Sequence, residues 1–454
     1  MRKSKEKTKE PKEHKAAIKR GQSDACIDSA EREQARPKHK KPWQETYATV
    51  KEIEDFLRDR TMLRFNTVTH RVECHEPTEF NTDVPGGWEP ITNRELMSQW
   101  RAMSFEKRVR EADMKNLIDS DFVPKYNPFE FYLKRLPPWN EDKGDYIMEL
   151  SLSVNVKGDG EEQMLFYEYL KKWLVAMVAS WVDPLVVNNV ILVLIGPQGI
   201  YKTTWFNFLL PPELRQFFYT KTNAEFRNKD DLLVLSQYGL LCCEELDTMK
   251  PPDMNRLKAA VTMPYIDVRA PFERYPEHRP HIASFCGTGN NVQFLTDSTG
   301  NRRWLPFEVE SIESPWQNPL NYEGIYSQAY RLYRDGFRFY FSQEEVNRLN
   351  RHNEQFEAVN LERELIDTYF RIPQDYEYGE VMPVSRALQI AGGNLTSELR
   401  KDKMRMAFAE LGFRYKHTNA ARGFIVMQRS PQEIKERQRM LATDGDTVTP
   451  VTPK

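Results

Sequence analysis

The chain has 454 residues, of which 40% are hydrophobic and 12% aromatic. This composition excludes a wholly disordered protein, and the length predicts several domains. The 65 basic and 67 acidic side chains give a net charge near −2, which excludes a uniformly basic nucleic-acid binder, so any DNA-binding surface has to be local.

The five cysteines form no C-x-x-C pair, and the charged N-terminal segment lacks the apolar run of a signal peptide. The cysteine pattern indicates neither a disulfide framework nor a structural zinc site, and it is typical of a reducing compartment. We therefore expect a cytoplasmic protein without a membrane span.

Three segments precede the most informative part of the sequence. Residues 1–42 carry 14 Lys and Arg against 7 Asp and Glu. This predicts a basic disordered arm, and two interpretations stay open: a solvated tail or an arm that contacts nucleic-acid phosphates. Residues 43–125 predict a small mixed domain, with helices around Ile53 and Leu96 and a hairpin near Asn66. Residues 126–184 predict a helical lead-in.

Residues 185–312 begin with a strand, a glycine loop and a short helix, the context of a phosphate-binding loop. The continuous apolar run 190–195 predicts a buried parallel strand. Glycines let backbone N–H groups converge on phosphates, Lys202 can reach the β and γ phosphates, and the Thr203 hydroxyl can bind Mg²⁺. The predicted nucleotide-binding residues are Gly196, Pro197, Gln198, Gly199, Ile200, Tyr201, Lys202, Thr203 and Thr204.

One residue of this loop departs from the pattern G-x-x-x-x-G-K-S/T, because Tyr201 stands where the second glycine is expected. We expect a helical backbone at this position, which would accept a side chain.

A second apolar strand, 240–243, ends at the acidic pair Glu244 and Glu245. A nucleotide hydrolase needs one carboxylate near Mg²⁺ and one that activates water. We assign Glu244, with Thr203, to the metal and Glu245 to the base. The alternative is an acidic surface cluster without a catalytic role.

A third strand ends at Asn290 and Asn291, and we choose Asn290 as the amide that senses the γ-phosphate. Arg302 and Arg303 follow, and a guanidinium suits the charge of the phosphoryl transition state. In ring-shaped ATPases such an arginine usually serves a neighbour's site. The alternatives are a turn asparagine and two surface arginines paired with acids.

Basic and aromatic residues alternate between residues 258 and 280, as in a loop that follows a nucleic-acid strand. A solvated hairpin is the alternative interpretation. The candidate DNA contacts in this segment are Arg269, Arg274, Tyr275 and Arg279.

The C-terminal third predicts a helical extension at 313–375 with one helical segment over 344–370, a winged-helix-like domain at 376–430 and a disordered tail at 431–454. Two helices followed by two strands carry the winged-helix prediction, and a protein-docking domain is the alternative. The basic side chains that could meet DNA phosphates there are Lys401, Lys403, Lys416 and Arg422.

Five motifs within residues 165–310 resemble, in order, those of the virulence-associated protein E family, the helicase part of phage and mobile-element primase-helicases. They read GPQGIYKTT, ELDTMKPPDMNRLKAAVT, VRAPFERYP, FCGTGNN and DSTGNRRWLP. The acidic pair, basic loop and asparagine strand also resemble superfamily 3 viral helicases. The resemblance implies an AAA+-like ATPase that uses ATP and Mg²⁺, forms rings, commonly hexamers, and moves along DNA. It also implies an arginine finger, Arg302 or Arg303, acting in trans, and pore contacts between Arg269 and Arg279.

The expected fold is α/β, with a P-loop core around a parallel sheet, a helical N-terminal region and a winged-helix-like C-terminal domain. The expected function is that of an ATP-dependent DNA helicase or translocase in replication of a phage or integrated mobile element. No paired-carboxylate primase site is evident in the first 160 residues, so a separate primase is an expected partner. An ATP-switched DNA-binding regulator or initiator is the main alternative, and an ATP-dependent defence or toxin component is a third.

Overall fold

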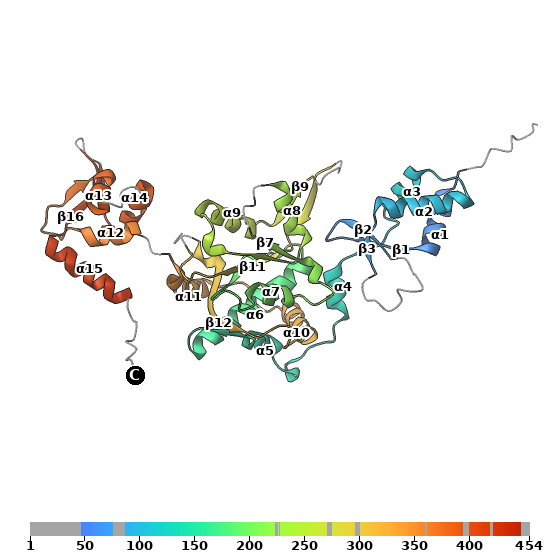
Figure 1. Cartoon of the computed structure of the whole chain (residues 1–454), viewed down its shortest axis with the longest axis horizontal. Coiled ribbons are helices and arrows are strands. Elements are labelled where there is room, and N and C mark those ends of the chain that lie inside the picture. Colours follow the sequence, from blue (N-terminus) through green and yellow to red (C-terminus); the bar gives the residue numbers. More distant parts are fainter. Residues whose placement is uncertain are drawn as a thin grey trace, which may run out of the picture.

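The computed structural model describes residues 47–75, 87–222, 226, 228–269, 275–295, 300–358, 361–393, 399–417 and 421–445. The chain forms three parts, coloured blue, green to brown, and orange to red in Figure 1. Each part has a hydrophobic core of its own, and the large central part has two, one on each face of its sheet.

The N-terminal part combines helices with a small sheet, so it is mixed rather than purely helical. Its sheet has the order β3-β2-β1-β4. The helices α1 and α2 begin at capping boxes, in which Thr49 pairs with Glu52 and Thr92 with Glu95. The elements are α1 (Val50–Arg60), β1 (Met62–Asn66), β2 (Arg71–His75), β3 (Glu89–Pro90), α2 (Asn93–Glu106), α3 (Glu111–Ile118) and β4 (Lys125–Tyr126).

A six-stranded sheet organises the central part, with the order β5-β12-β6-β11-β8-β7. Five strands are parallel and only β5, at one edge, runs antiparallel to its neighbour β12. The strands are β5 (Val154–Val156), β6 (Ile191–Ile195), β7 (Phe218–Lys221), β8 (Leu240–Cys243), β11 (Ser284–Gly289) and β12 (Trp304–Ile312). The predicted parallel central sheet of an α/β P-loop protein is confirmed.

Helices cover both faces of this sheet, which explains the continuous apolar runs of its strands. In β6, Leu192 and Leu194 join one core, and Ile191, Val193 and Ile195 join the other. Helices of the first face are α4 (Pro128–Arg135), α5 (Tyr146–Leu152), α6 (Gly160–Val182), α7 (Lys202–Leu209) and α10 (Tyr322–Arg334). Helices of the second face are α8 (Lys229–Gln237) and α9 (Pro251–Val261).

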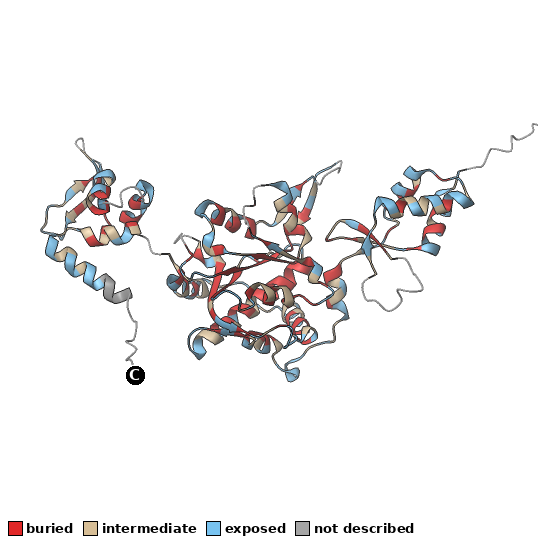
Figure 2. Cartoon of the chain, in the orientation of Figure 1, coloured by how far each residue is buried: buried red, intermediate tan, exposed pale blue. Residues whose placement is uncertain are grey.

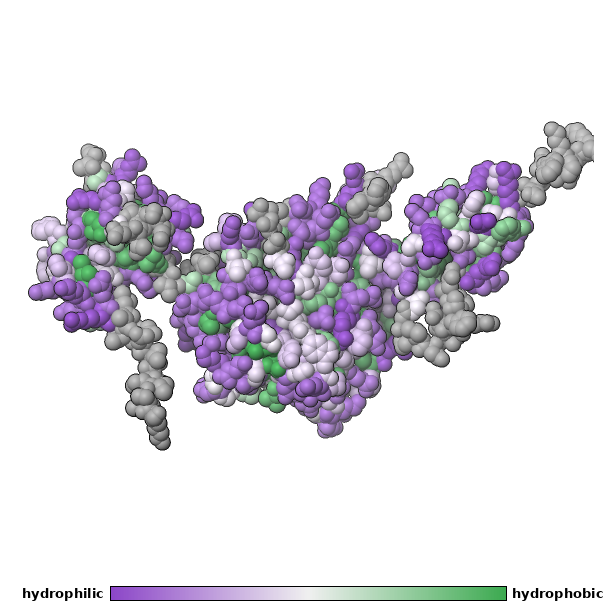
Figure 3. All heavy atoms as spheres, viewed as in Figure 1, coloured by the Kyte–Doolittle hydropathy of each residue, from purple (hydrophilic) through white to green (hydrophobic). Residues whose placement is uncertain are grey.

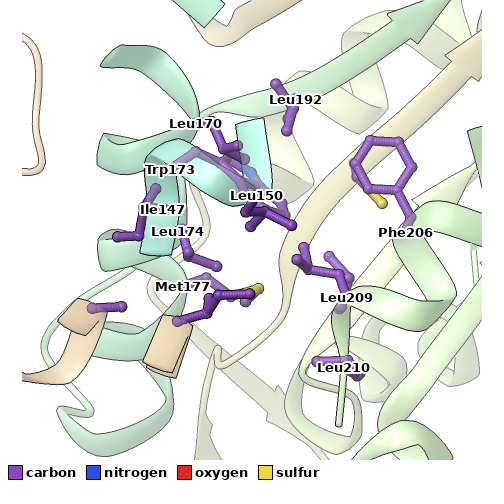
Figure 4. Packing of buried hydrophobic residues seen from close by; sticks show 14 of the residues in the cluster. Ile147, Leu150, Leu170, Trp173, Leu174, Met177, Leu192, Phe206, Leu209 and Leu210 are labelled. Atoms are coloured by element: carbon purple, nitrogen blue, oxygen red, sulfur yellow. The ribbon is translucent and has the colours of Figure 1, made fainter. Parts of the chain in front are cut away.

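The 23-residue helix α6 lies at the centre of the first core (Figures 2 and 4). The Trp173 and Trp181 indoles donate hydrogen bonds to the carbonyl oxygens of Phe285 and Gly239, at 3.0 and 3.1 Å. The helix predicted as a lead-in is therefore built into the central core, which begins before residue 185. Among the described helices none combines the length and apolar character needed to cross a bilayer, and the face seen in Figure 3 is mostly hydrophilic.

The single helical segment predicted for 344–370 is wrong, because the structure contains two helices with different partners. α11 (Gln343–Asn353) ends before the 3-10 turn at Glu354–Phe356, and α12 begins at Leu361. Leu349 of α11 belongs to the central core, whereas Ile366 of α12 belongs to the C-terminal core.

The C-terminal part packs helices on a small antiparallel sheet in which β16 pairs with β13, β14 and β15. Its elements are α12 (Leu361–Tyr369), β13 (Phe370–Arg371), β14 (Glu380–Met382), α13 (Val384–Gly392), α14 (Lys401–Glu410), β15 (Tyr415–His417), β16 (Arg422–Gln428) and α15 (Pro431–Gly445). The winged-helix-like identification stays a prediction. The predicted tail is wrong for 431–445, where α15 is tied to α12 by an Arg437–Asp367 ion pair of 2.6 Å.

Candidate nucleotide-binding site

The glycine loop leaves the sheet at the carboxyl end of β6, between β11 and β12. The Gly196 N–H donates to the Gly289 carbonyl at 3.2 Å. A Cβ on Gly196 would lie 2.3 Å from the Val309 carbonyl oxygen, so only glycine fits this close approach of two backbones. The neighbouring strands therefore fix where the loop begins.

Lys202 is buried beneath this loop at the start of α7. Its ammonium donates to the carbonyl oxygens of Gly196 and Pro197, both at 2.7 Å, and to Asn290 Oδ1 at 3.3 Å. Burial lowers the pKa of Lys202, and the nearby Asp247 carboxylate opposes that shift. The contact with Lys202 favours Asn290 over Asn291 as the sensing amide.

Tyr201 caps α7 in a left-handed conformation, with φ 68° and ψ 18°. The expected helical backbone at this residue is wrong. The loop keeps the geometry that the missing glycine would adopt, although a side chain there costs about 1–2 kcal/mol. Such strain persists only where the surrounding structure holds the residue in place.

Thr203 and Glu244 form the candidate metal site. The Thr203 hydroxyl donates to Glu244 Oε1 at 2.9 Å, joining α7 to the residue that follows β8. A hydroxyl and a carboxylate suit Mg²⁺, which usually takes one or two carboxylates and completes its shell with phosphates and water. Within the described residues no group of three or more His, Cys, Asp or Glu could hold a metal alone. The residues therefore fit Mg²⁺ that arrives with a nucleotide.

Glu245, the candidate base, is exposed and also left-handed, with φ 53° and ψ 44°. Its carbonyl oxygen accepts hydrogen bonds from the Thr248 amide and hydroxyl, both at 2.9 Å. These contacts hold the turn that follows the acidic pair at the end of β8.

Asp247 is a site residue that the sequence reasoning did not assign. Its Oδ2 accepts the backbone N–H groups of Asn290 and Asn291 at 3.2 and 3.0 Å. The acidic segment after β8 is thereby fastened to the asparagine segment after β11. The available signal was a third carboxylate two positions after the acidic pair.

Arg302 and Arg303 lie at the opposite end of the sheet from the glycine loop. They directly precede β12, whose first residue, Trp304, pairs with Ile191, the first residue of β6. The loop follows the last residue of β6, about 16 Å further along the strand. Burial and the neighbouring Arg302 lower the pKa of Arg303, whose Nε has no hydrogen-bond partner among the described residues. Both arginines line a cavity of about 560 Å³, and neither meets the phosphate loop of its own chain.

The candidate DNA contacts of the central part separate into exposed and buried residues. Arg269 and Tyr275 are exposed next to the strands β9 (Tyr265–Val268) and β10 (Glu277–Pro280). Arg279 is only 3% exposed and forms an ion pair with Glu277 at 2.6 Å, so its guanidinium does not face solvent. Arg274 lies outside the described residues.

The four basic candidates of the C-terminal part are all exposed. Lys401 and Lys403 lie in the first turn of α14, Lys416 lies on β15 and Arg422 begins β16.

Comparison with protein families identifies the central part. Residues 149–358 match the model of the virulence-associated protein E-like domain. The central part is therefore similar to virulence-associated protein E-like domains, over a match that spans less than half of the chain. The resemblance inferred from the five motifs is thus confirmed over a range that contains the glycine loop, the acidic pair and both arginines.

Solved structures of low identity are also similar to the chain. The apo structure of the NrS-1 C-terminal region is 13% identical, covers 83% of this chain and 98% of its own, and has a TM-score of 0.44. The A-form apo structure of that region is 14% identical with the same coverage and a TM-score of 0.42. A mutant of Thermotoga maritima RuvB is 14% identical over 60% of this chain and 94% of its own, with a TM-score of 0.23. No curated protein matches the chain.

Proposed function

We propose that the protein is an ATP-dependent DNA helicase or translocase that serves replication of a phage or an integrated mobile element. One observation carries the proposal: side chains from three separate segments meet at the carboxyl edge of the sheet. Lys202 contacts Asn290, and Thr203 contacts Glu244. This edge is where α/β proteins commonly bind nucleotides. The virulence-associated protein E-like domain supports the assignment.

The proposed roles follow from the chemistry of each side chain. Backbone N–H groups of the loop and the Lys202 ammonium bind the phosphates. Thr203 and Glu244 hold Mg²⁺, which would neutralise charge on the phosphate oxygens. Glu245 orients and deprotonates the attacking water, and Asn290 senses the γ-phosphate.

The position of the arginines supports a ring of identical subunits. Because Arg302 and Arg303 lie at the sheet edge opposite the phosphate loop, a head-to-tail neighbour could bring them to the next subunit's nucleotide. We propose a ring, with six subunits as the expected number. DNA would contact Arg269 and Tyr275 in the central part and the exposed basic side chains of the C-terminal part. Priming would come from a separate protein.

An ATP-switched DNA-binding regulator is the second candidate. The strained Tyr201 in the phosphate loop favours it, because a loop that binds ATP without turning it over would serve as a switch. Exposed basic residues on α14 would then carry the function.

ATP hydrolysis measured with and without single-stranded DNA tests the proposal. Lys202→Ala and Glu245→Gln should abolish a DNA-stimulated activity, and Glu141→Gln, an exposed glutamate outside the site, serves as the control. Strand-displacement assays would then distinguish unwinding from translocation. Tight ATP binding without turnover in the unaltered protein would contradict the motor and favour the switch.

A further inference from the structure

Tyr201 of the phosphate loop and Trp316, which lies between β12 and α10, form an exposed aromatic corner. Their rings lie 5.6 Å apart between centroids, at an angle of 77°. The Tyr201 side chain is 42% exposed and that of Trp316 62% exposed. Exposed tryptophan carries a large apolar area, so its position beside a ligand loop calls for an explanation by binding.

Structure behind the corner holds these rings in place. The Trp316 ring also meets Phe208 edge-on at 5.3 Å, and the Arg215 guanidinium lies 4.2 Å from the Phe208 ring centroid. Arg215 in turn donates to the Tyr322 hydroxyl at 3.0 Å, which donates to the Phe208 carbonyl at 2.7 Å. Residues of α7 and α10 thus help to hold the Trp316 ring in position.

The backbone of Tyr201 indicates that the corner is more than packing. The residue keeps a left-handed conformation that glycine would adopt without strain. Residues with strained backbone angles cluster at functional sites in proteins. Here the strained residue carries an exposed ring and immediately precedes Lys202 in the chain, whose ammonium would bind the phosphates.

We infer that Tyr201 and Trp316 form the base-binding subsite of the nucleotide site, with a purine base stacked on the open face of Trp316 and contacting Tyr201 at its edge. The inference rests on the proposed nucleotide site and adds the class of base that it takes. Base–aromatic stacking contributes about 1–3 kcal/mol and tolerates different bases. A purine presents more stacking area than a pyrimidine, so ATP and GTP should bind more tightly than CTP and UTP.

Equilibrium binding of ATP and of inorganic triphosphate to the full chain tests this subsite. Trp316→Ala should weaken ATP binding by about 5- to 140-fold, the equivalent of that stacking energy, and leave triphosphate binding unchanged. Trp316→Phe should restore most of the ATP affinity, and the purine preference should disappear in Trp316→Ala. Tyr378→Ala, a fully exposed tyrosine in the C-terminal part, is the matched control.

Three outcomes would overturn the inference. Unchanged ATP affinity in Trp316→Ala would show that the two rings do not bind the base. If the oligomeric state of this variant changed while its ATP affinity did not, the rings would form a subunit contact instead. Equal weakening of ATP and triphosphate would mean that Trp316 shapes the loop and does not bind a base. If the unaltered protein bound neither ligand, the proposed function itself would fail together with the inference. Thermal unfolding of each variant distinguishes a loss of ATP binding from a loss of the folded state.

Discussion

Thr203 and Glu244 are 41 positions apart in the chain, yet Thr203 Oγ1 lies 2.9 Å from Glu244 Oε1. One residue begins the helix after β6 and the other follows β8, two strands that are separated by β11 in the sheet. Parallel strands bring their carboxyl ends to one edge, so residues after different strands can share a ligand. The hydrogen bond between Thr203 and Glu244 therefore joins the phosphate loop to the acidic segment after β8.

Removing the hydroxyl of Thr203 should weaken Mg²⁺ use. We expect Thr203→Ala to raise the Mg²⁺ concentration needed for half-maximal ATP hydrolysis by tenfold or more, about 1.4 kcal/mol, because one oxygen ligand is lost. Thr203→Ser should behave almost like the unaltered protein, and Glu141→Gln, outside the site, is the control. Equal Mg²⁺ requirements in Thr203→Ala and Glu141→Gln would exclude Thr203 as a ligand.

The separation of the arginines from the phosphate loop predicts complementation between subunits. Arg303→Ala should lower ATP hydrolysis by about 10³-fold or more, the usual effect of losing an arginine finger. Mixing Arg303→Ala chains with Glu245→Gln chains should restore part of the activity, because an intact loop can then meet an intact arginine. The same mixing experiment with Arg302→Ala in place of Arg303→Ala shows which arginine acts. If ATP hydrolysis did not recover in either mixture, action of the arginine in trans would be contradicted.

Asp247 is expected to act by positioning the asparagine segment. Asp247→Ala removes the acceptor of two backbone N–H groups, each hydrogen bond to a charged group contributing about 1.5–3 kcal/mol. We expect kcat to fall while the Kd for ATP stays within a few-fold, because the phosphate contacts of the loop remain. A rise in Kd with unchanged kcat would assign Asp247 to binding instead. Asp335→Ala, outside the site, is the control.

His281 should make stability fall on acidification. Burial lowers the pKa of this histidine to about 4, and its Nδ1 lies 2.7 Å from the Met263 carbonyl oxygen. Below pH 6.5 the unfolded chain takes up the proton and the folded chain does not, so stability is lost by roughly 1.4 kcal/mol per pH unit down to about pH 4. Above pH 7 this contribution is constant.

Chemical unfolding between pH 4 and 8 measures the effect. His281→Gln should flatten the acid limb, whatever it does to stability at pH 8. His278→Gln, a more exposed histidine on the same hairpin, should leave the limb unchanged. Parallel acid limbs in His281→Gln and the unaltered protein would show that other groups cause the loss.

The sequence predicted the strands that carry the site because their burial on both faces leaves continuous apolar runs. The strands β6 and β8 lie within a residue of the predicted ranges 190–195 and 240–243. The order of the elements alone was enough to place the residues after these strands at the carboxyl edge of the sheet. The resemblance to a family came from the five motifs.

Other features depend on contacts or backbone angles that residue types do not encode. The sign of φ at Tyr201 cannot be read from tyrosine, which normally avoids the left-handed region. Asp247 contacts a segment 43 positions away. The polar composition of 431–445 indicated a tail, whereas the ion pair with Asp367 anchors a helix. In contrast, the burial of Arg279 had a local signal, since Glu277 lies two positions earlier on the same face of β10.

The place of α6 in the chain has a consequence for synthesis. All five parallel strands of the sheet follow this helix, so its apolar surface leaves the ribosome before the strands that cover it. Nascent chains that expose such surface are prone to aggregate. Fragments that end before β12 would lack both β12 and α10 and leave part of α6 uncovered, and chaperone binding during translation should be strongest over this interval.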